Sequence, residues 1–119
     1  MKTVENVITV VTESGKTSGV ETLKLDEGFV TGVVVYYNSN SNQGTVRLRL
    51  TDGQGNEIAK MQNIENFRSR NVEYAKDGKP LFIKGGQTIK AQVQSTDTFS
   101  QNAEIDVIFI FDTNQTPNY

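Results

Sequence analysis

The stretch TVRLRLT, residues 45–51, alternates apolar and basic side chains without interruption. A period of two is that of a β-strand with one face buried and the other in solvent. The sequence DGQGN, residues 52–56, follows at once and is rich in residues that tolerate a turn, and Glu57–Met61 leads back from it. These residues predict a β-hairpin with Arg47 and Arg49 on its solvent face.

Similar alternation, broken by turn sequences, recurs along the chain. Further strands are expected at residues 4–12, 20–25, 29–38, 72–75, 81–84, 88–96 and 104–111, and residues 63–71 predict a loop with a short helical turn. The composition agrees, because 13 Val, 8 Ile and 13 Thr stand against 5 Leu and 4 Ala, and β-branched side chains favour strands. The chain is therefore predicted to be all-β.

Eight or nine short strands without a linker predict one antiparallel two-sheet β-sandwich. A jelly roll of about eight strands is favoured over an immunoglobulin-like sandwich, because the chain has no Cys and no Trp to supply the immunoglobulin pattern. The domain is expected to span residues 1–112, with residues 113–119 as a polar C-terminal tail.

The residue types that are absent restrict the chemistry. Without His there can be no Ser-His-Asp triad, and without Cys no disulfide or thiolate nucleophile. We expect no enzyme activity and no cofactor. A net charge of −2 with interspersed signs does not favour nucleic acid as a partner. No apolar run approaches the length of a membrane-spanning helix, and no signal peptide is recognisable, so synthesis in the cytoplasm is expected.

Two groups of acidic residues could carry chemistry. Glu104 and Asp106 share one strand face about 7 Å apart, a separation used by inverting glycosidases. An exposed polar edge of the last strand explains the pair better, because no Trp is present as a sugar platform. Asp52–Glu57 resembles a Ca²⁺ loop, to which Asp26, Glu27 and Asp97 could add oxygens, but its spacing fits a hairpin turn better. Gly85-Gly86 and Ser14–Gly19 lack a phosphate-binding fingerprint and are interpreted as turns.

Basic and apolar side chains suggest contacts with other proteins. Arg68 and Arg70, beside Phe67, and the strand pair Arg47 and Arg49 could bind nucleic acid, form a protein interface or simply be solvated. Two strands are also apolar on a second face, which requires either a cover or burial at the ends of a twisted sandwich. The candidate subunit interface comprises Val34, Tyr36, Ile108, Ile110, Arg47, Arg49 and Tyr119 of the tail.

The strand series Phe29–Asn38, Thr45–Thr51, Thr88–Thr96 and Glu104–Phe111 resembles the small single jelly-roll structural proteins of virions. The nearest comparison is the vertex (penton) or minor capsid proteins of icosahedral tailless bacteriophages. The resemblance implies a homo-oligomer, pentamer or trimer, that contacts neighbouring capsid proteins in the virion. We therefore expect a non-enzymatic structural protein of a viral capsid (vertex, minor capsid or decoration). The alternative is a carbohydrate- or ligand-binding β-sandwich whose loops are stabilised by Ca²⁺.

Overall fold

The computed structural model describes residues 5–38, 44–67 and 79–112, with only the backbone of residues 37, 38, 79 and 80. Their regular elements are eight β-strands and one 3-10 helix. They are β1 (Glu5–Thr12), β2 (Ser18–Lys24), β3 (Phe29–Asn38), β4 (Val46–Asp52), β5 (Glu57–Asn63), η1 (Ile64–Phe67), β6 (Lys79–Lys84), β7 (Thr88–Ser95) and β8 (Ala103–Phe111). These strand boundaries lie within two residues of those predicted, and η1 is the expected helical turn. The strand predicted at 72–75 lies outside the described residues.

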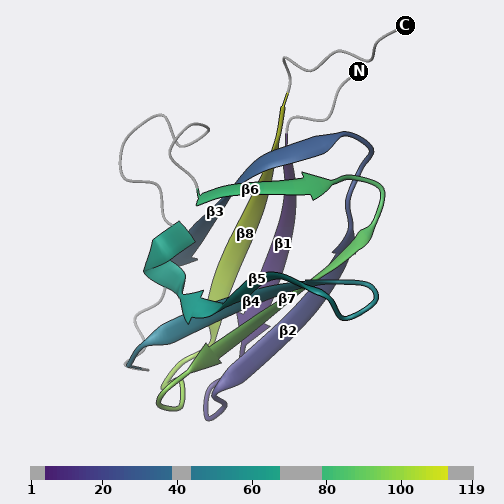
Figure 1. Cartoon of the computed structure of the whole chain (residues 1–119). Coiled ribbons are helices and arrows are strands. Elements are labelled where there is room, and N and C mark those ends of the chain that lie inside the picture. Colours follow the sequence, from purple (N-terminus) through teal and green to yellow (C-terminus); the bar gives the residue numbers. More distant parts are fainter. Residues whose placement is uncertain (1–4, 39–43, 68–78, 113–119) are drawn as a thin grey trace, which may run out of the picture.

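The strands form two antiparallel four-stranded sheets with the orders β1-β8-β3-β6 and β2-β7-β4-β5 (Figure 1). Among the eight described strands, β4 and β5 are the only consecutive pair within one sheet, and every other consecutive pair lies in different sheets. Eight strands wound between two sheets in this order form a jelly roll. The all-β sandwich predicted from the alternation is therefore confirmed.

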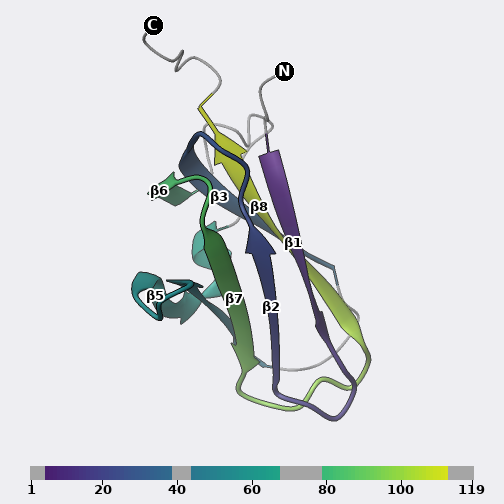
Figure 2. The same ribbon diagram turned by 90° about the vertical axis from the view of Figure 1, so that its right-hand side faces the viewer.

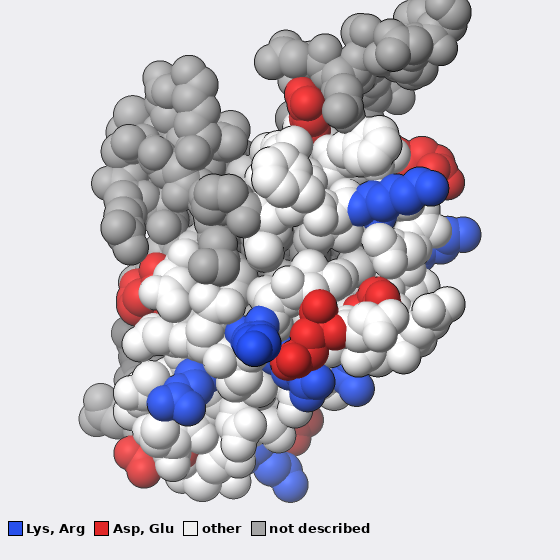
Figure 3. All heavy atoms as spheres, in the orientation of Figure 1, with Lys and Arg blue, Asp and Glu red and all other residues white. Residues whose placement is uncertain are grey.

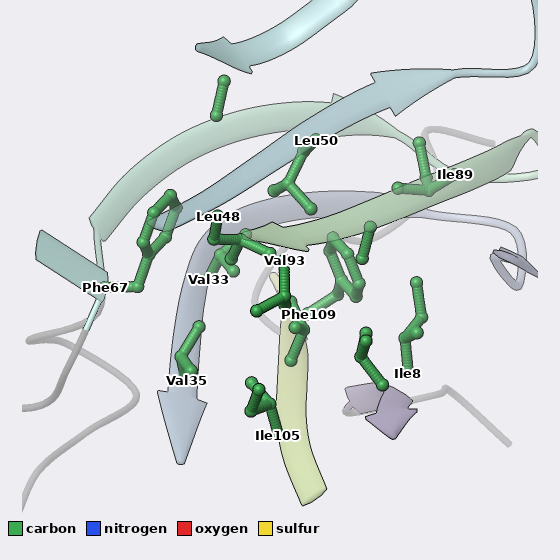
Figure 4. Packing of buried hydrophobic residues seen from close by; sticks show 14 of the residues in the cluster. Ile8, Val33, Val35, Leu48, Leu50, Phe67, Ile89, Val93, Ile105 and Phe109 are labelled. Atoms are coloured by element: carbon green, nitrogen blue, oxygen red, sulfur yellow. The ribbon is translucent and has the colours of Figure 1, made fainter. Parts of the chain in front are cut away.

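The core lies between the sheets and is built from the inward residues of seven strands (Figure 4). Leu48 and Leu50 of β4 face Val33 and Val35 of β3 across it, as their parity predicts. Phe67 of η1 closes one side and is fully buried. Burial of apolar surface at about 25 cal/mol per Å² is the main favourable contribution to such a fold.

Close main-chain contacts hold the corners of the sandwich. A Cβ atom on Gly19 of β2 would lie 2.8 Å from the Val11 carbonyl oxygen of β1, so no larger residue fits where these two strands approach (Figure 2). At the opposite end of β2, Asn6 and Asp26 form a reciprocal pair of hydrogen bonds at 2.9 and 3.1 Å. These contacts fix β1 against the second sheet.

The loops at the far end of β1 interlock around an aromatic residue. Gly15 N donates to the Phe99 carbonyl at 2.7 Å, and Phe99 N donates to the Lys16 carbonyl at 2.8 Å. The Phe99 ring is buried in the core although the residue lies in the β7–β8 loop. This end of the sandwich is therefore closed by a loop residue.

Candidate functional site

A second apolar cluster lies on the sheet face that points away from the core. Val34, Ile108 and Ile110 are 0, 9 and 6 % exposed and form a cluster separate from the main core. Their strand neighbours Val33, Val107 and Phe109 point inward, so the alternation of β-strands sends these three outward. Burial inside the ends of the sandwich, one of the two interpretations left open above, is therefore excluded for them.

The cluster continues to the edge of its sheet. Val34 of β3 lies opposite Ile108 of β8, and Ile108 lies opposite Val7 of β1. Exposure rises along this row from 0 % at Val34 to 43 % at Val7. The row thus carries apolar side chains across three adjacent strands on the side where a small sandwich normally places polar residues.

Two phenylalanines extend the apolar surface at the other edge. Phe82 of β6 is 86 % exposed and Phe29 of β3 is 52 % exposed. Phe29 lies opposite Lys84, two residues beyond Phe82 on the same face of β6, so the rings are diagonal neighbours. The outer apolar face is defined from here on as six residues: Val7, Phe29, Val34, Phe82, Ile108 and Ile110.

Phe29 and Phe82 were not among the predicted site residues. Phe82 stands between Leu81, which packs against the core, and the buried Ile83. The sequence signal for Phe82, as for Val34, was an apolar residue at a strand position whose two neighbours both face the core. The weak alternation of residues 81–84 concealed it.

The carboxylate pair lies farther along the same sheet face, in a polar setting. Asp106 Oδ1 accepts a hydrogen bond of 2.7 Å from Thr9 Oγ1, and Glu104 is exposed two residues away. Exposed Tyr36 lies opposite Asp106 on β3. This arrangement ties β1 to β8, and the Thr9 contact gives Asp106 a structural role.

The predicted interface residues divide between two faces. Arg47 and Arg49 lie on the outer face of β2-β7-β4-β5, opposite Gln94 and Gln92 of β7, whereas Val34, Tyr36, Ile108 and Ile110 lie on the outer face of the other sheet. Arg49 Nε is 3.1 Å from Glu57 Oε2 in an ion pair that is about two-fifths exposed. In Figure 3, charged side chains gather over β4 and β5 and are sparse over β6. Tyr119 lies outside the described residues.

The Asp52–Glu57 segment forms a turn whose carboxylate is already engaged. Asp52 Oδ1 accepts hydrogen bonds of 2.9 Å from both Gln54 N and Asn56 N, and Asn56 Nδ2 lies 3.2 Å from Oδ2. These bonds, chiefly that from the Asn56 main chain, lower the pKa of Asp52 below its ordinary value. The hairpin interpretation is confirmed, and the Asp52 oxygens stabilise the turn.

The glycine-rich segments are turns as well. Gly85 N donates to the Gly28 carbonyl at 2.7 Å, and Gly86 N approaches the carbonyls of Leu25 and Asp26 at 3.1 Å. In the first loop, Ser14 N donates to Asn102 Oδ1 at 2.8 Å. The main-chain donors that would have to bind a phosphate already serve carbonyl and amide oxygens of the same chain.

Residues 5–38, 44–67 and 79–112 contain no group of three or more acidic, His or Cys side chains arranged to hold a metal ion. Within the same residues no helix is long and apolar enough to cross a membrane. Arg68 and Arg70 lie outside the described part of the chain, so the arginine cluster around Phe67 keeps its status as a prediction. Phe67 itself is a core residue.

The fold and this surface define an all-β protein of the jelly-roll class with an apolar outer sheet face. Comparison with protein-family models, with curated proteins and with solved structures finds no match to the chain.

Proposed function

We propose that this protein is a non-enzymatic structural subunit that acts through protein–protein contacts in a symmetric assembly, namely a viral capsid, as a vertex, minor capsid or decoration protein. The observation that carries the proposal is the outer apolar face. Exposed large apolar side chains on a small domain mark an interaction site. On this face Phe29 and Phe82 are exposed at one edge of the sheet and Val7 at the other, whereas Val34, Ile108 and Ile110 between them are buried within the chain.

The opposite sheet face provides an internal comparison. Its central strands present Arg47, Arg49, Lys90, Gln92 and Gln94 to solvent, in register across β4 and β7. This is the polar pattern expected of an antiparallel sheet with one face in water. The outer apolar face departs from that pattern although both faces belong to the same domain. The difference supports a role of this face in binding another protein, because an apolar composition of the whole chain would affect both faces alike.

The capsid part of the proposal rests on fold-level analogy. Jelly rolls with two four-stranded sheets are common in viral capsid domains, and the strand orders found here are of that type. Because one fold serves many functions, the assembly has to be observed directly. Negative-stain electron microscopy of the concentrated protein should show closed rings or shells, and a field of dispersed monomers would count against a capsid role.

Association is tested by native mass spectrometry on Phe82→Ser. Phe82 is almost fully exposed, so the variant should keep its melting temperature and raise the dissociation constant at least about tenfold. Val20→Ser, on the outer face of the other sheet and 54 % exposed, is the matched control and should not change association. A wild-type protein that stays monomeric at high concentration contradicts the proposal.

A carbohydrate-binding sandwich is the second candidate, because Phe29 and Phe82 present two neighbouring aromatic rings to solvent. Aromatic rings supply apolar platforms for sugars, and lectins also use jelly rolls. Glycan-array binding that is lost in Phe82→Ser while the protein remains monomeric would favour this candidate. Binding unaffected by a chelator would remove the calcium-stabilised form of it.

A further inference from the structure

The outer face of the β2-β7-β4-β5 sheet carries almost only basic and neutral polar side chains. Leu23, Ile89 and Leu50 contact the core from three of its strands, so the residues beside them point to the outer face. The outward positions of β2, β7 and β4, all of which the structure describes, hold no acidic residue. They are Ser18, Val20, Thr22 and Lys24 of β2, Thr88, Lys90, Gln92 and Gln94 of β7, and Arg47, Arg49 and Thr51 of β4.

The fourth strand, β5, adds one cation and one acid to this face. Lys60 is exposed beside the inward Ala59, and Glu57 forms the ion pair with Arg49 at 3.1 Å. The remaining cations of the face form no ion pair with a described residue, and they are Lys24, Arg47, Lys60 and Lys90. The face therefore has an excess of positive charge.

The outer face of the other sheet has the opposite sign. Its described charged side chains are Glu5, Glu104, Asp106 and Lys84. The sandwich is thus electrically polarised across its two sheets, and the net charge of −2 averages over both faces. Solvated surfaces normally intersperse the two signs, so this segregation favours an anionic partner for the basic face.

The strand register arranges four of the cations in one diagonal stripe. Arg47 and Arg49 are two residues apart on β4, about 7 Å. Lys90 of β7 lies one pair beyond the partner of Arg49 on the same face, and Lys24 of β2 is displaced from Lys90 in the same way. Such diagonal neighbours are about 7–8 Å apart. Like charges repel at this spacing, and a bound polyanion relieves the repulsion.

The side chains around the stripe match those that contact nucleic-acid phosphates. Arg and Lys neutralise phosphate charge, and Ser, Thr and Gln donate hydrogen bonds to phosphate oxygens. Val20 is the one apolar residue at the outward positions of β2, β7 and β4, whereas a protein interface has an apolar centre. These positions also lack the aromatic rings on which single strands usually stack their bases. The combination favours a duplex that is contacted through its backbone.

We propose that the basic stripe of Lys24, Lys90, Arg49 and Arg47 binds the phosphate backbone of a nucleic-acid duplex without reading its sequence. This binding goes beyond the proposed assembly and is independent of it, because the two contacts use the outer faces of different sheets. Each cation of the stripe neutralises one phosphate, so affinity depends steeply on salt.

Fluorescence anisotropy with a labelled DNA duplex tests this binding. Wild type should bind with a dissociation constant of about 1–100 µM, which is typical of contact with the backbone alone. The logarithm of the association constant should fall against the logarithm of the NaCl concentration with a slope of about −3 to −4, close to −0.9 for each phosphate.

Lys90→Ser and Lys84→Ser form a matched pair, because each removes one exposed lysine from a strand and changes the net charge equally. Lys90→Ser should weaken binding at least about threefold and make the slope shallower by about one. Lys84→Ser, on the other sheet, should change neither. The paired variant Arg47→Ser, Arg49→Ser should weaken binding at least about tenfold, with its oligomer mass unchanged.

A gain of affinity provides a second matched pair. Glu57→Gln removes the acid beside Arg49 and should strengthen binding, whereas Glu104→Gln makes the same charge change on the other sheet and should not.

The outcomes separate this inference from the proposed assembly. Selective effects at residues 90 and 57 support it, even if the wild type is monomeric. Equal effects at residues 90 and 84 overturn it, because net charge alone would then govern binding. Absence of binding at low salt also overturns it and leaves the assembly function standing. Displacement of the duplex by polyglutamate as readily as by unlabelled duplex, or tighter binding of a single strand, likewise overturns it.

Discussion

Gly85 lies where the turn after β6 crosses the loop between β2 and β3. A Cβ atom here would lie 2.2 Å from the Asp26 carbonyl oxygen and within 3 Å of the Gly28 main chain. These neighbours are backbone atoms held by the Gly85–Gly28 hydrogen bond, so they cannot rotate away as a side chain can. We expect Gly85→Ala to lower the free energy of unfolding by about 1–3 kcal/mol, as overpacking generally does, measured by urea denaturation.

Gly53 offers the matched control for that substitution. A Cβ atom added to Gly53 would lie 3.7 Å from its nearest neighbour, the Thr88 carbonyl oxygen, and the φ of Gly53 is not in the left-handed region. Gly53→Ala should therefore leave stability within about 0.5 kcal/mol of the wild type. Equal effects at residues 53 and 85 would mean that the close crossing of the two loops does not constrain the fold.

At the level of elements, the β4–β5 hairpin contains a carboxyl group, that of Asp52, whose pKa is clearly displaced. Hydrogen bonds led by Asn56 N lower the pKa of Asp52 in the folded state, so the native protein binds fewer protons than the unfolded chain near that pKa. The stabilisation is fully present above the unfolded pKa and is lost as the pH falls through the folded pKa. Wild type should exceed Asp52→Asn in stability above about pH 5, with the difference shrinking toward acid.

Carboxyl NMR titration measures the same quantity directly. Asp52 should titrate below the ordinary range for aspartate. Asn56→Ala should raise the pKa of Asp52 only part of the way toward the ordinary value, because the variant loses the side-chain amide of residue 56 and keeps its main-chain donor. An unshifted Asp52 in the folded wild type would show that the turn does not hold the carboxylate.

The elements themselves were largely predictable because alternation is a local property. Val46, Leu48 and Leu50 reveal an inward face without any knowledge of their partners, and the observed strand agrees to within one residue. Phe99 could not be assigned in this way. It is buried because the β1–β2 and β7–β8 loops meet around it, and such contact between distant segments leaves no periodic signal.

The candidate surface was predictable only in part, for a related reason. Parity shows that Val34 and Ile108 oppose their core neighbours, but it does not show which strands adjoin. Sheet order decides that these two residues share a face, and that Arg47 and Arg49 belong to the other one. The pattern of each single strand could therefore propose interface residues, but it could not show that these residues lie on the outer faces of two different sheets.

At the scale of the molecule, the two outer sheet faces have different physical character. One face carries the outer apolar face together with Tyr36 of β3 and with Glu104 and Asp106 near the start of β8. The other face exposes arginine, lysine and glutamine. Apolar contacts are insensitive to ionic screening, whereas contacts between exposed charges weaken as salt is raised. The face used for association can thus be identified from its response to salt.

The paired variant Arg47→Ser, Arg49→Ser tests that identification. Because both side chains lie on the face opposite the outer apolar face, the oligomer mass should be unchanged, and raising NaCl to about 0.5 M should not dissociate wild type or variant. Stability should fall by no more than about 1 kcal/mol, since the Arg49–Glu57 ion pair that the variant loses is exposed. Analytical ultracentrifugation at low and high salt measures both mass and salt response. A variant that becomes monomeric, or a wild type that dissociates in salt, would move the interface to the β2-β7-β4-β5 face.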